Sequence, residues 1–578
     1  MPPKKKTATK QVKQETKEES FVDPPKPFST KIPQKPIFRI VKYRCLQQAK
    51  QARIKLWKFS SCTIYPISED YTSTSSDKSL EFISIQRNPT PRKILKYVRK
   101  IEAFVEYSNA PFEKFFSPTW KLSSLTLKCN SKFPWENFLL SIVHPKIQTL
   151  SLEAPMAHRR NADQLQEKMT LSPSAILKAL NKFSELTELE VNFPSFENSS
   201  DQRFKKGITL RKLKKLHISH GFLSPLNFQL SKLDNLEKIH LLRRKLYGDE
   251  TLIFQNLSQL KNLKSLSIDF NFSSLIAKPI FANIANYSQL QALSFALHGS
   301  GDYPLELLMQ LKNLRELSLT ENFLFSRENQ RPPIKFPSFE KLEKINLDCN
   351  GKRFSLESLQ EALFNSSCLK EMTVSLAFQE LSQFFDIHPQ CSLERLSIGI
   401  SRPLPPYGKP MKALTDFLKG QKQLKSLKLH FESIYADITE PTFKVLGSLT
   451  SLEDFTFSFV RLGELQDMKF TMLKDSFSKL QNLKTLQFFT KNKKTFSTEL
   501  SSMINGFMKL KSLEKFTYTA DFQQITPAVF NKFLGFVSSM RHFKNIDIQI
   551  GGRSKEDLDQ LKELVYGKHP LWFNENFS

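Results

Sequence analysis

The sequence predicts an α/β solenoid, in which a curved parallel sheet lies inside and helices lie outside. Three observations predict it. A short apolar pattern, Leu-x-x-Leu-x-Leu with Ile, Val, Phe, Met or Tyr allowed at the apolar positions, occurs sixteen times from about residue 120 onward. From Leu186 onward successive copies begin 23 to 31 residues apart, and stretches with helical spacing fall between them. A unit of one strand and one helix cannot bury its apolar side alone, so such units must stack into one continuous core.

The clearest copies of the pattern begin at Leu263, Leu314 and Leu424. The last two apolar positions of each copy alternate with polar ones, which is the spacing of a strand with one buried face. The pattern therefore predicts sixteen short parallel strands. The other thirteen copies begin at Leu122, Ile147, Leu186, Leu213, Leu236, Leu290, Leu342, Leu369, Leu393, Leu452, Leu483, Leu513 and Phe543.

Helices are predicted between the strands. The first covers residues 175–183 and is entered through Ser172-Pro173-Ser174, where Ser can cap the helix and Pro suits its first turn. Others are expected over residues 356–363, 411–418, 500–508 and 528–536. Residues 554–578 are predicted to be a C-terminal cap, whose helix presents an apolar stripe that includes Leu558 and Leu561 and ends at Gly567.

The pattern resembles the leucine-rich-repeat superfamily over roughly residues 115–578, and the helix-bearing units of 27–31 residues are similar to its ribonuclease-inhibitor-like class. The resemblance implies a non-catalytic binding scaffold with residues 119–553 as the solenoid. One departure is visible. The Asn that the family usually carries three residues after the last Leu is found only at Asn130, Asn271, Asn322 and Asn350. We therefore expect irregular turns after the strands and an irregular superhelix.

The chain is strongly basic, with a net charge of +28, and residues 1–100 contribute +15 of it. Residues 1–36 have few apolar side chains and are predicted to be a disordered basic arm. Residues 37–118 are predicted to be a basic, partly helical segment, with an amphipathic helix after Pro91. They can serve as the N-terminal cap of the solenoid, with the lysines in solvent. Alternatively, their interleaved basic and aromatic residues can bind nucleic acid, because cations pair with phosphates and rings stack on bases.

The candidate polyanion-binding residues all lie in this N-terminal part of the chain. Their partner is DNA, RNA or an acidic protein surface. Pro2, Pro3 and the three lysines that follow resemble a nuclear import signal, although a solvated tail has the same composition. The candidates are Lys4, Lys5, Lys6, Lys42, Arg44, Arg53, Lys55, Lys58, Arg92, Lys93, Lys96, Arg99 and Lys100.

The residues that alternate with the buried Leu positions are expected on the concave face. Nine of the sixteen central positions are Ser or Thr and only one is Lys, whereas a surface for a phosphate backbone requires rows of Lys and Arg. We therefore expect a protein partner there. His217 and His240 lie on adjacent strands, either as a pH-sensitive spot or as a hydrogen-bonded surface pair. The candidate contact residues are Glu190, His217, His240, Asn346, Lys428, Gln487 and Asp547.

No catalytic, metal or cofactor site is predicted. The sequence has no P-loop, HExxH motif, nucleophile elbow or kinase signature, and its six cysteines form no CxxC pair. No apolar run reaches the eighteen residues of a membrane span, and the N-terminus is unlike a secretory signal. The sequence thus predicts a protein-interaction scaffold of the nucleus or cytosol, a subunit of a larger complex. The alternative is a nucleic-acid-associated subunit that binds through residues 1–100.

Overall fold

The structure is a computed structural model, and the parts of the chain that it describes are given below. Three short segments precede the repeats, and most of each repeat follows. The described residues are 38–41, 61–66, 100–105, 123–129, 146–153, 178–193, 210–220, 233–243, 251–270, 274–298, 304–322, 336–348, 356–364, 366–378, 380–386, 391–401, 408–434, 436–462, 471–490, 497–521, 525–539, 545–551, 556–557 and 559–561.

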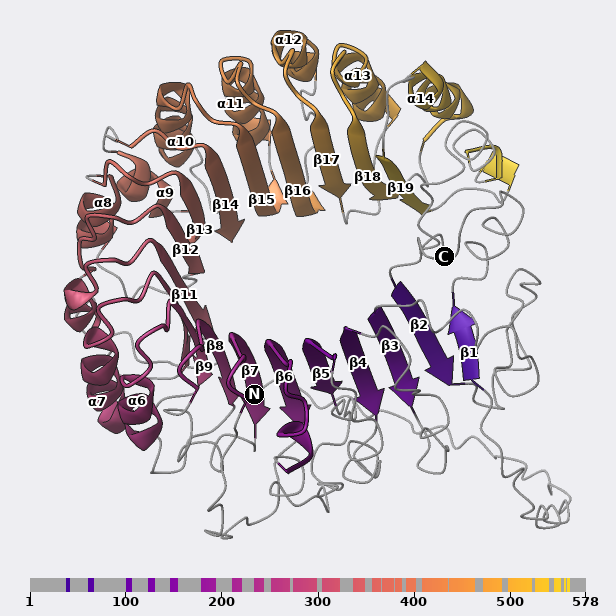
Figure 1. The fold of residues 1–578 in the computed structure, drawn as a ribbon. Helices are drawn as coiled ribbons and strands as arrows, with labels where there is room; N and C mark the ends of the chain where they lie inside the picture. The colour runs from indigo at the N-terminus through magenta and orange to yellow at the C-terminus, as the bar shows by residue number, and fades with distance from the viewer. Residues whose placement is uncertain are drawn as a thin grey trace, which may run out of the picture.

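In these ranges, nineteen strands form a single sheet (Figure 1). The first two pair antiparallel, and from β2 onward each strand pairs in parallel with the next along the chain. The strands are β1 (Phe38–Val41), β2 (Ser61–Pro66), β3 (Lys100–Val105), β4 (Ser124–Cys129), β5 (Thr149–Glu153), β6 (Glu188–Phe193), β7 (Lys215–His220), β8 (Lys238–Arg243), β9 (Ser265–Phe270), β10 (Ala292–His298), β11 (Glu316–Asn322), β12 (Lys344–Asp348), β13 (Glu371–Ala377), β14 (Arg395–Ser401), β15 (Ser426–Ile434), β16 (Asp454–Leu462), β17 (Thr485–Thr490), β18 (Lys515–Asp521) and β19 (Asn545–Gly551).

The register of the sheet repeats from strand to strand because the same apolar pattern recurs in each. Leu266 of β9 lies opposite Ile239 of β8 and Leu293 of β10, and all three side chains are at most 3% exposed. Each of the sixteen predicted copies ends in one of the strands β4 to β19. These strands, with the helices beside them, confirm the predicted fold class. The fold is an α/β leucine-rich-repeat solenoid.

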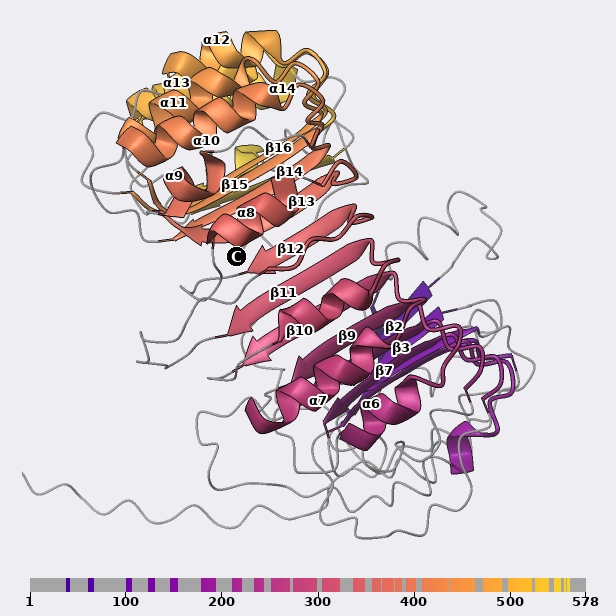
Figure 2. The same ribbon diagram turned by 90° about the vertical axis from the view of Figure 1, so that its left-hand side faces the viewer.

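The helices follow the outer side of the curved sheet (Figure 1), and seen from that side α6, α7 and α8 lie over the strands (Figure 2). Four of the five predicted helices correspond to α8, α10, α13 and α14, and residues 178–180 of the fifth are helical. The outer elements are α6 (Thr251–Leu257), α7 (Ser274–Ala285), a 3-10 helix (Leu305–Gln310), α8 (Leu356–Phe364), α9 (Glu380–Phe385), α10 (Gly408–Gly420), α11 (Ala436–Leu446), α12 (Thr471–Lys479), α13 (Ser497–Phe507) and α14 (Pro527–Ser539).

Helix α10 shows why these segments are helical. Met411, Leu414 and Leu418 recur at intervals of three and four residues and are at most 1% exposed, so one apolar stripe faces the sheet. Lys412 and Asp416, between them, are exposed. The same intervals in each unit place the apolar stripes of successive helices on one continuous core.

The core of the last repeats is rich in aromatic rings. In β16 and β17, Phe457 and Phe488 are at most 1% exposed, and their ring centroids lie 5.3 Å apart. Phe488 also lies 5.9 Å from the ring of Tyr518 in β18. Offset and edge-to-face rings at such distances add to the free energy gained by burial alone. The aromatic rings therefore join consecutive repeats.

The sheet begins before the repeat pattern does. Strands β2 and β3 continue it in parallel toward the N-terminus, and β3 pairs with β4 from Lys100 opposite Ser124 to Val105 opposite Cys129. The expectation that Lys100 and Ile101 belong to the amphipathic helix after Pro91 was wrong, because both lie in β3. The alternation of Ile101, Ala103 and Val105 suits a strand. The backbone of β4 supplies the hydrogen-bond partners that this strand needs.

The two predicted end segments fall largely outside the described residues. The arm over residues 1–36 lies wholly outside them. In the C-terminal cap, Leu561 is 1% exposed and belongs to the main hydrophobic cluster, whereas Leu558 and Gly567 lie outside. Of the four Asn residues that match the family position, only Asn322 is described, at the end of β11. The domain boundaries 1–36, 37–118, 119–553 and 554–578 therefore stay predictions.

Candidate functional site

The predicted central positions form one continuous row on the inner face of the sheet. Glu190 lies opposite His217, His217 opposite His240 and His240 opposite Ser267. The helices cover the other face (Figure 1), so these side chains point away from the core. We call this row the central row. It consists of Thr126, Ser151, Glu190, His217, His240, Ser267, Ser294, Ser318, Asn346, Thr373, Ser397, Lys428, Thr456, Gln487, Thr517 and Asp547.

Neighbouring side chains of the central row contact one another where they are long enough. The Asn346 amide donates to Ser318 Oγ over 3.1 Å. The Thr456 hydroxyl donates to Gln487 Oε1 over 3.3 Å. Lys428 is exposed. The row thus offers hydroxyl and amide groups with a single lysine, and the role of its members in binding stays a prediction.

The most closely connected part of the row lies on β5 to β8. Ser151 Oγ donates to Glu190 Oε2 over 2.7 Å, and His217 Nδ1 lies 3.2 Å from Glu190 Oε1. The rings of His217 and His240 stack with their centroids 4.2 Å apart and their planes 16° apart. The sequence predicted that the two histidines adjoin, but it did not predict the link to Glu190. The structure therefore joins three of the predicted contact residues in one cluster.

The cluster shifts the pKa of two of its members. The hydrogen bond from His217 lowers the pKa of Glu190 to about 2. Burial lowers the pKa of His240 to about 4, and the neighbouring His217 adds to this lowering while Asp269 opposes it. In the neutral form His217 carries its proton on Nδ1 to donate to Glu190, which leaves the buried Nε2 without a hydrogen-bond partner. A proton on the His240 ring is therefore unfavourable.

The order of contacts does not suit nucleophilic catalysis. In a Ser-His-acid triad the imidazole lies between the hydroxyl and the carboxylate, so that it can accept the hydroxyl proton. Here the carboxylate of Glu190 lies in the middle and accepts from both Ser151 and His217. The cluster instead holds four polar side chains against one another on the concave face.

Protonation of this cluster is expected to make stability depend on pH. His240 has an unfolded pKa of 6.5 and a folded pKa of about 4. Between these values the unfolded chain binds the proton more tightly, so this residue lowers stability as the pH falls from 6.5 to about 4. His240→Phe keeps a ring for stacking but cannot titrate. We expect the difference in urea midpoint between His240→Phe and the wild type to grow in favour of the variant over this pH range. A difference that stays constant from pH 7 to pH 4.5 would contradict this expectation.

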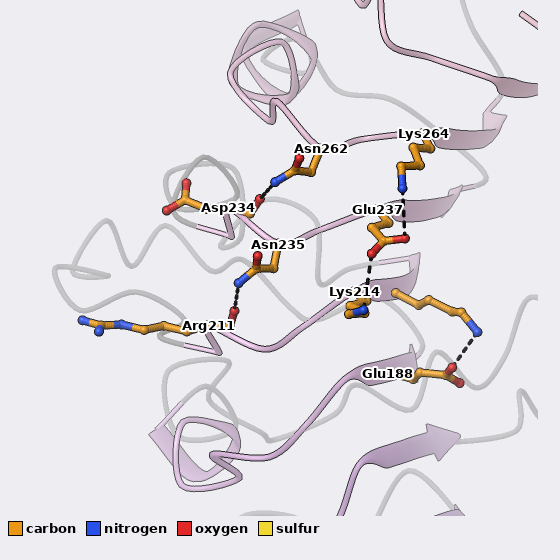
Figure 3. A network of polar contacts seen from close by, with 9 residues as sticks. Glu188, Arg211, Lys214, Asp234, Asn235, Glu237, Asn262 and Lys264 are labelled. Atoms are coloured by element: carbon orange, nitrogen blue, oxygen red, sulfur yellow. Dashed lines mark hydrogen bonds and ion pairs between the residues drawn. The ribbon is translucent and has the colours of Figure 1, made fainter.

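A second row of side chains precedes the strands and was not recognised in the sequence. From the copy at Leu213 to the copy at Leu513 it contains the residue after the first Leu, and its charges alternate in sign from repeat to repeat except at the uncharged Gln291. We call this row the edge ladder (Figure 3). The signal was present in the sequence, at a fixed place in the copies from Leu213 to Leu513. The edge ladder consists of Lys214, Glu237, Lys264, Gln291, Arg315, Glu343, Lys370, Glu394, Lys425, Glu453, Lys484 and Glu514.

Adjacent members of the edge ladder form ion pairs. Glu237 lies between two lysines, 3.5 Å from Lys214 Nζ and 3.6 Å from Lys264 Nζ (Figure 3). Lys484 Nζ lies 2.6 Å from Glu453 Oε2, a contact that lowers the pKa of Glu453 and raises that of Lys484. Two further pairs are Arg315–Glu343 at 2.9 Å and Lys425–Glu394 at 3.3 Å.

Asparagine residues form a second ladder beside the edge ladder, in the turns that enter β8, β9, β11 and β17, and Figure 3 shows the first two. The Asn262 amide donates to the carbonyl of Asp234 over 2.7 Å, and the Asn235 amide donates to the carbonyl of Arg211 over 2.6 Å. Asn313 and Asn482 make the same bond to the preceding repeat. The Asn expected from the family follows the strand, whereas these Asn residues precede the first Leu of the pattern.

The candidate polyanion-binding residues cannot be placed as a group. Lys100 lies at the start of β3, and the other twelve, from Lys4 to Arg99, lie outside the described residues. Within the described ranges, His, Cys, Asp and Glu side chains do not gather in groups of three that could hold a metal ion. The helices in those ranges are too short or too polar to cross a bilayer.

Comparisons with known proteins find likenesses among solved structures. No protein-family model matches the chain, and no curated protein matches it. Among solved structures, the chain is similar to that in the crystal structure of a TLR13-ssRNA13 complex. The two share 14% identity over 79% of this chain and 71% of that one, with a TM-score of 0.35. That TM-score is too low to bear on fold or function, which rest here on the repeats and the strand register.

Proposed function

We propose that this protein is a non-catalytic protein-interaction scaffold, a subunit of a larger complex, whose concave face contacts its partner. The central row carries the proposal. Sixteen strands in register present hydroxyl and amide side chains there, and Lys428 is its one Lys or Arg. Small polar groups on a rigid sheet allow a protein surface to approach closely, whereas a nucleic-acid backbone requires many cations. The 27–31-residue units with helices support assignment to the ribonuclease-inhibitor-like class.

The charges beside the central row support the same proposal. The acidic and basic groups of the edge ladder pair with one another, so they do not present a uniformly positive surface. At the first residue of each strand, Glu371 of β13 lies 3.5 Å from Lys344 of β12 and also contacts Arg395 of β14. A surface of mixed, internally paired charges favours a protein partner over a polyanion.

Substitutions in the central row test the proposal. Ser267 and Ser294 lie opposite each other on β9 and β10 and are partly exposed. We expect Ser267→Arg with Ser294→Arg to abolish partner binding, because two long cations would occupy the space that a partner must enter. The partner is first identified by cross-linking the full chain in cells with mass-spectrometric readout. Its affinity for purified wild-type and variant proteins is then compared.

Ser478→Arg supplies the matched control. Ser478 is exposed in α12 on the outer side, so the same kind of substitution there should leave binding unchanged. Circular dichroism establishes that all variants are folded. Equal affinity of the double variant and the control would show that the concave face does not bind the partner.

A further inference from the structure

The repeats of this chain present almost interchangeable surfaces to one another. Strands β4 to β19 each offer two buried apolar positions, and Leu427 of β15 lies between Leu396 of β14 and Phe455 of β16. The backbone contacts are equally uniform. The carbonyl of Glu237 accepts from the amides of Lys264 and Ser265, and that of Glu453 accepts likewise from Lys484 and Thr485. Neither contact identifies which repeat should lie next to which.

The edge ladder distinguishes the repeats where these contacts do not. From β7 to β18 its charges alternate in sign, with Gln291 as the one uncharged member of the series. Nearest neighbours in the native order therefore attract, except at Gln291. If one repeat were skipped during stacking, two ladder residues of the same charge would become neighbours. Examples are Glu394 with Glu453, and Lys425 with Lys484. At the ion-pair distances of the native ladder, such like charges repel.

We propose that the alternating edge ladder selects the correct neighbour for each repeat, and so prevents the chain from stacking with a repeat omitted or inserted. The segments that connect successive strands differ in length from repeat to repeat. Their length alone therefore does not determine which repeat stacks on which, and a second signal is needed. The ion pairs join side chains that are about half exposed, and exposed pairs contribute little to stability. Their regular alternation acts instead by making the wrong arrangements unfavourable.

An exchange of two charges tests the proposal at constant composition. Glu394→Lys combined with Lys425→Glu changes the local order from alternating to paired, so that the new Lys adjoins Lys370 and the new Glu adjoins Glu453. Net charge stays the same. The control is Asp416→Lys with Lys419→Asp, which reverses an exposed ion pair within α10 and leaves the ladder intact. The full-length proteins are diluted from urea at low and high salt, and native monomer is quantified by size-exclusion chromatography and circular dichroism.

We expect the yield of native monomer for the exchanged ladder to fall by about threefold at low salt, because two attractive contacts become repulsive. The yield should recover near 1 M salt, where the screening length is only about 3 Å, and the control should match the wild type throughout. An unchanged yield at low salt would overturn the proposal, as would a loss that salt does not reverse. A lower urea midpoint with an unchanged yield would also overturn it, since the ladder would then only stabilise the fold.

Discussion

Replacing Phe488 by alanine is expected to lower the free energy of unfolding by about 3–5 kcal/mol. Phe488 in β17 is 1% exposed. Its ring lies 5.3 Å from Phe457 and 6.3 Å from Phe507, and thus connects β16 and α13. The substitution removes the buried surface of a whole ring and leaves a cavity among aromatic neighbours that cannot all collapse into it. The urea midpoint measured by circular dichroism provides the test.

Phe489 is a matched control because it is the next residue on the same strand and points to the opposite face. It is partly exposed on the inner surface, so Phe489→Ala should change stability by less than about 1 kcal/mol. In a repeat protein the loss from Phe488→Ala is also expected to be local. Faster hydrogen exchange should therefore appear first in β16 to β18. Equal destabilisation by the two substitutions would show that the buried and open faces of β17 had been assigned wrongly.

Replacing Gln421 by leucine is expected to destabilise the protein by about 1–3 kcal/mol, although leucine occupies this position in other repeats. Leu260, Leu311 and Leu480 are its counterparts. Gln421 is 2% exposed, and its Oε1 accepts from the backbone N–H of Leu393 over 2.9 Å. In most repeats the corresponding N–H donates to the carbonyl three residues earlier, as in Leu263 to Leu260.

The glutamine therefore compensates for an irregular turn in the preceding repeat. Leucine fills the same space but leaves the Leu393 N–H buried without an acceptor, and an unsatisfied buried donor costs more than the added apolar surface contributes. Gln421→Glu serves as the comparison, because it keeps both the shape of the side chain and an acceptor oxygen for the Leu393 N–H. The difference between the two variants then reports the loss of the hydrogen bond. A higher urea midpoint for Gln421→Leu than for the wild type would refute this role of the glutamine.

The apolar pattern in the sequence was sufficient to predict strands β4 to β19, their order and their register. Sixteen copies of one pattern each produced a strand, and the central row from Thr126 to Asp547 was read correctly, because the two-residue period of a strand is a local property. The helices followed from the same kind of local periodicity, as α10 and α14 show. The positions of Glu190, His217 and His240 in one row were also accessible without a structure.

Tertiary structure decided the contacts between repeats. Glu190 meets His217, and Gln421 meets Leu393, across 27 and 28 residues of chain. Such contacts depend on side-chain rotamers and on the irregular turns between strands, which no local period determines. The strand at Lys100 likewise depends on pairing with β4, and the local pattern there favoured a helix. Apolar periodicity determines which residues enter the core. The polar side chains find their partners only when stacking has brought the strands of successive repeats within about 5 Å of one another.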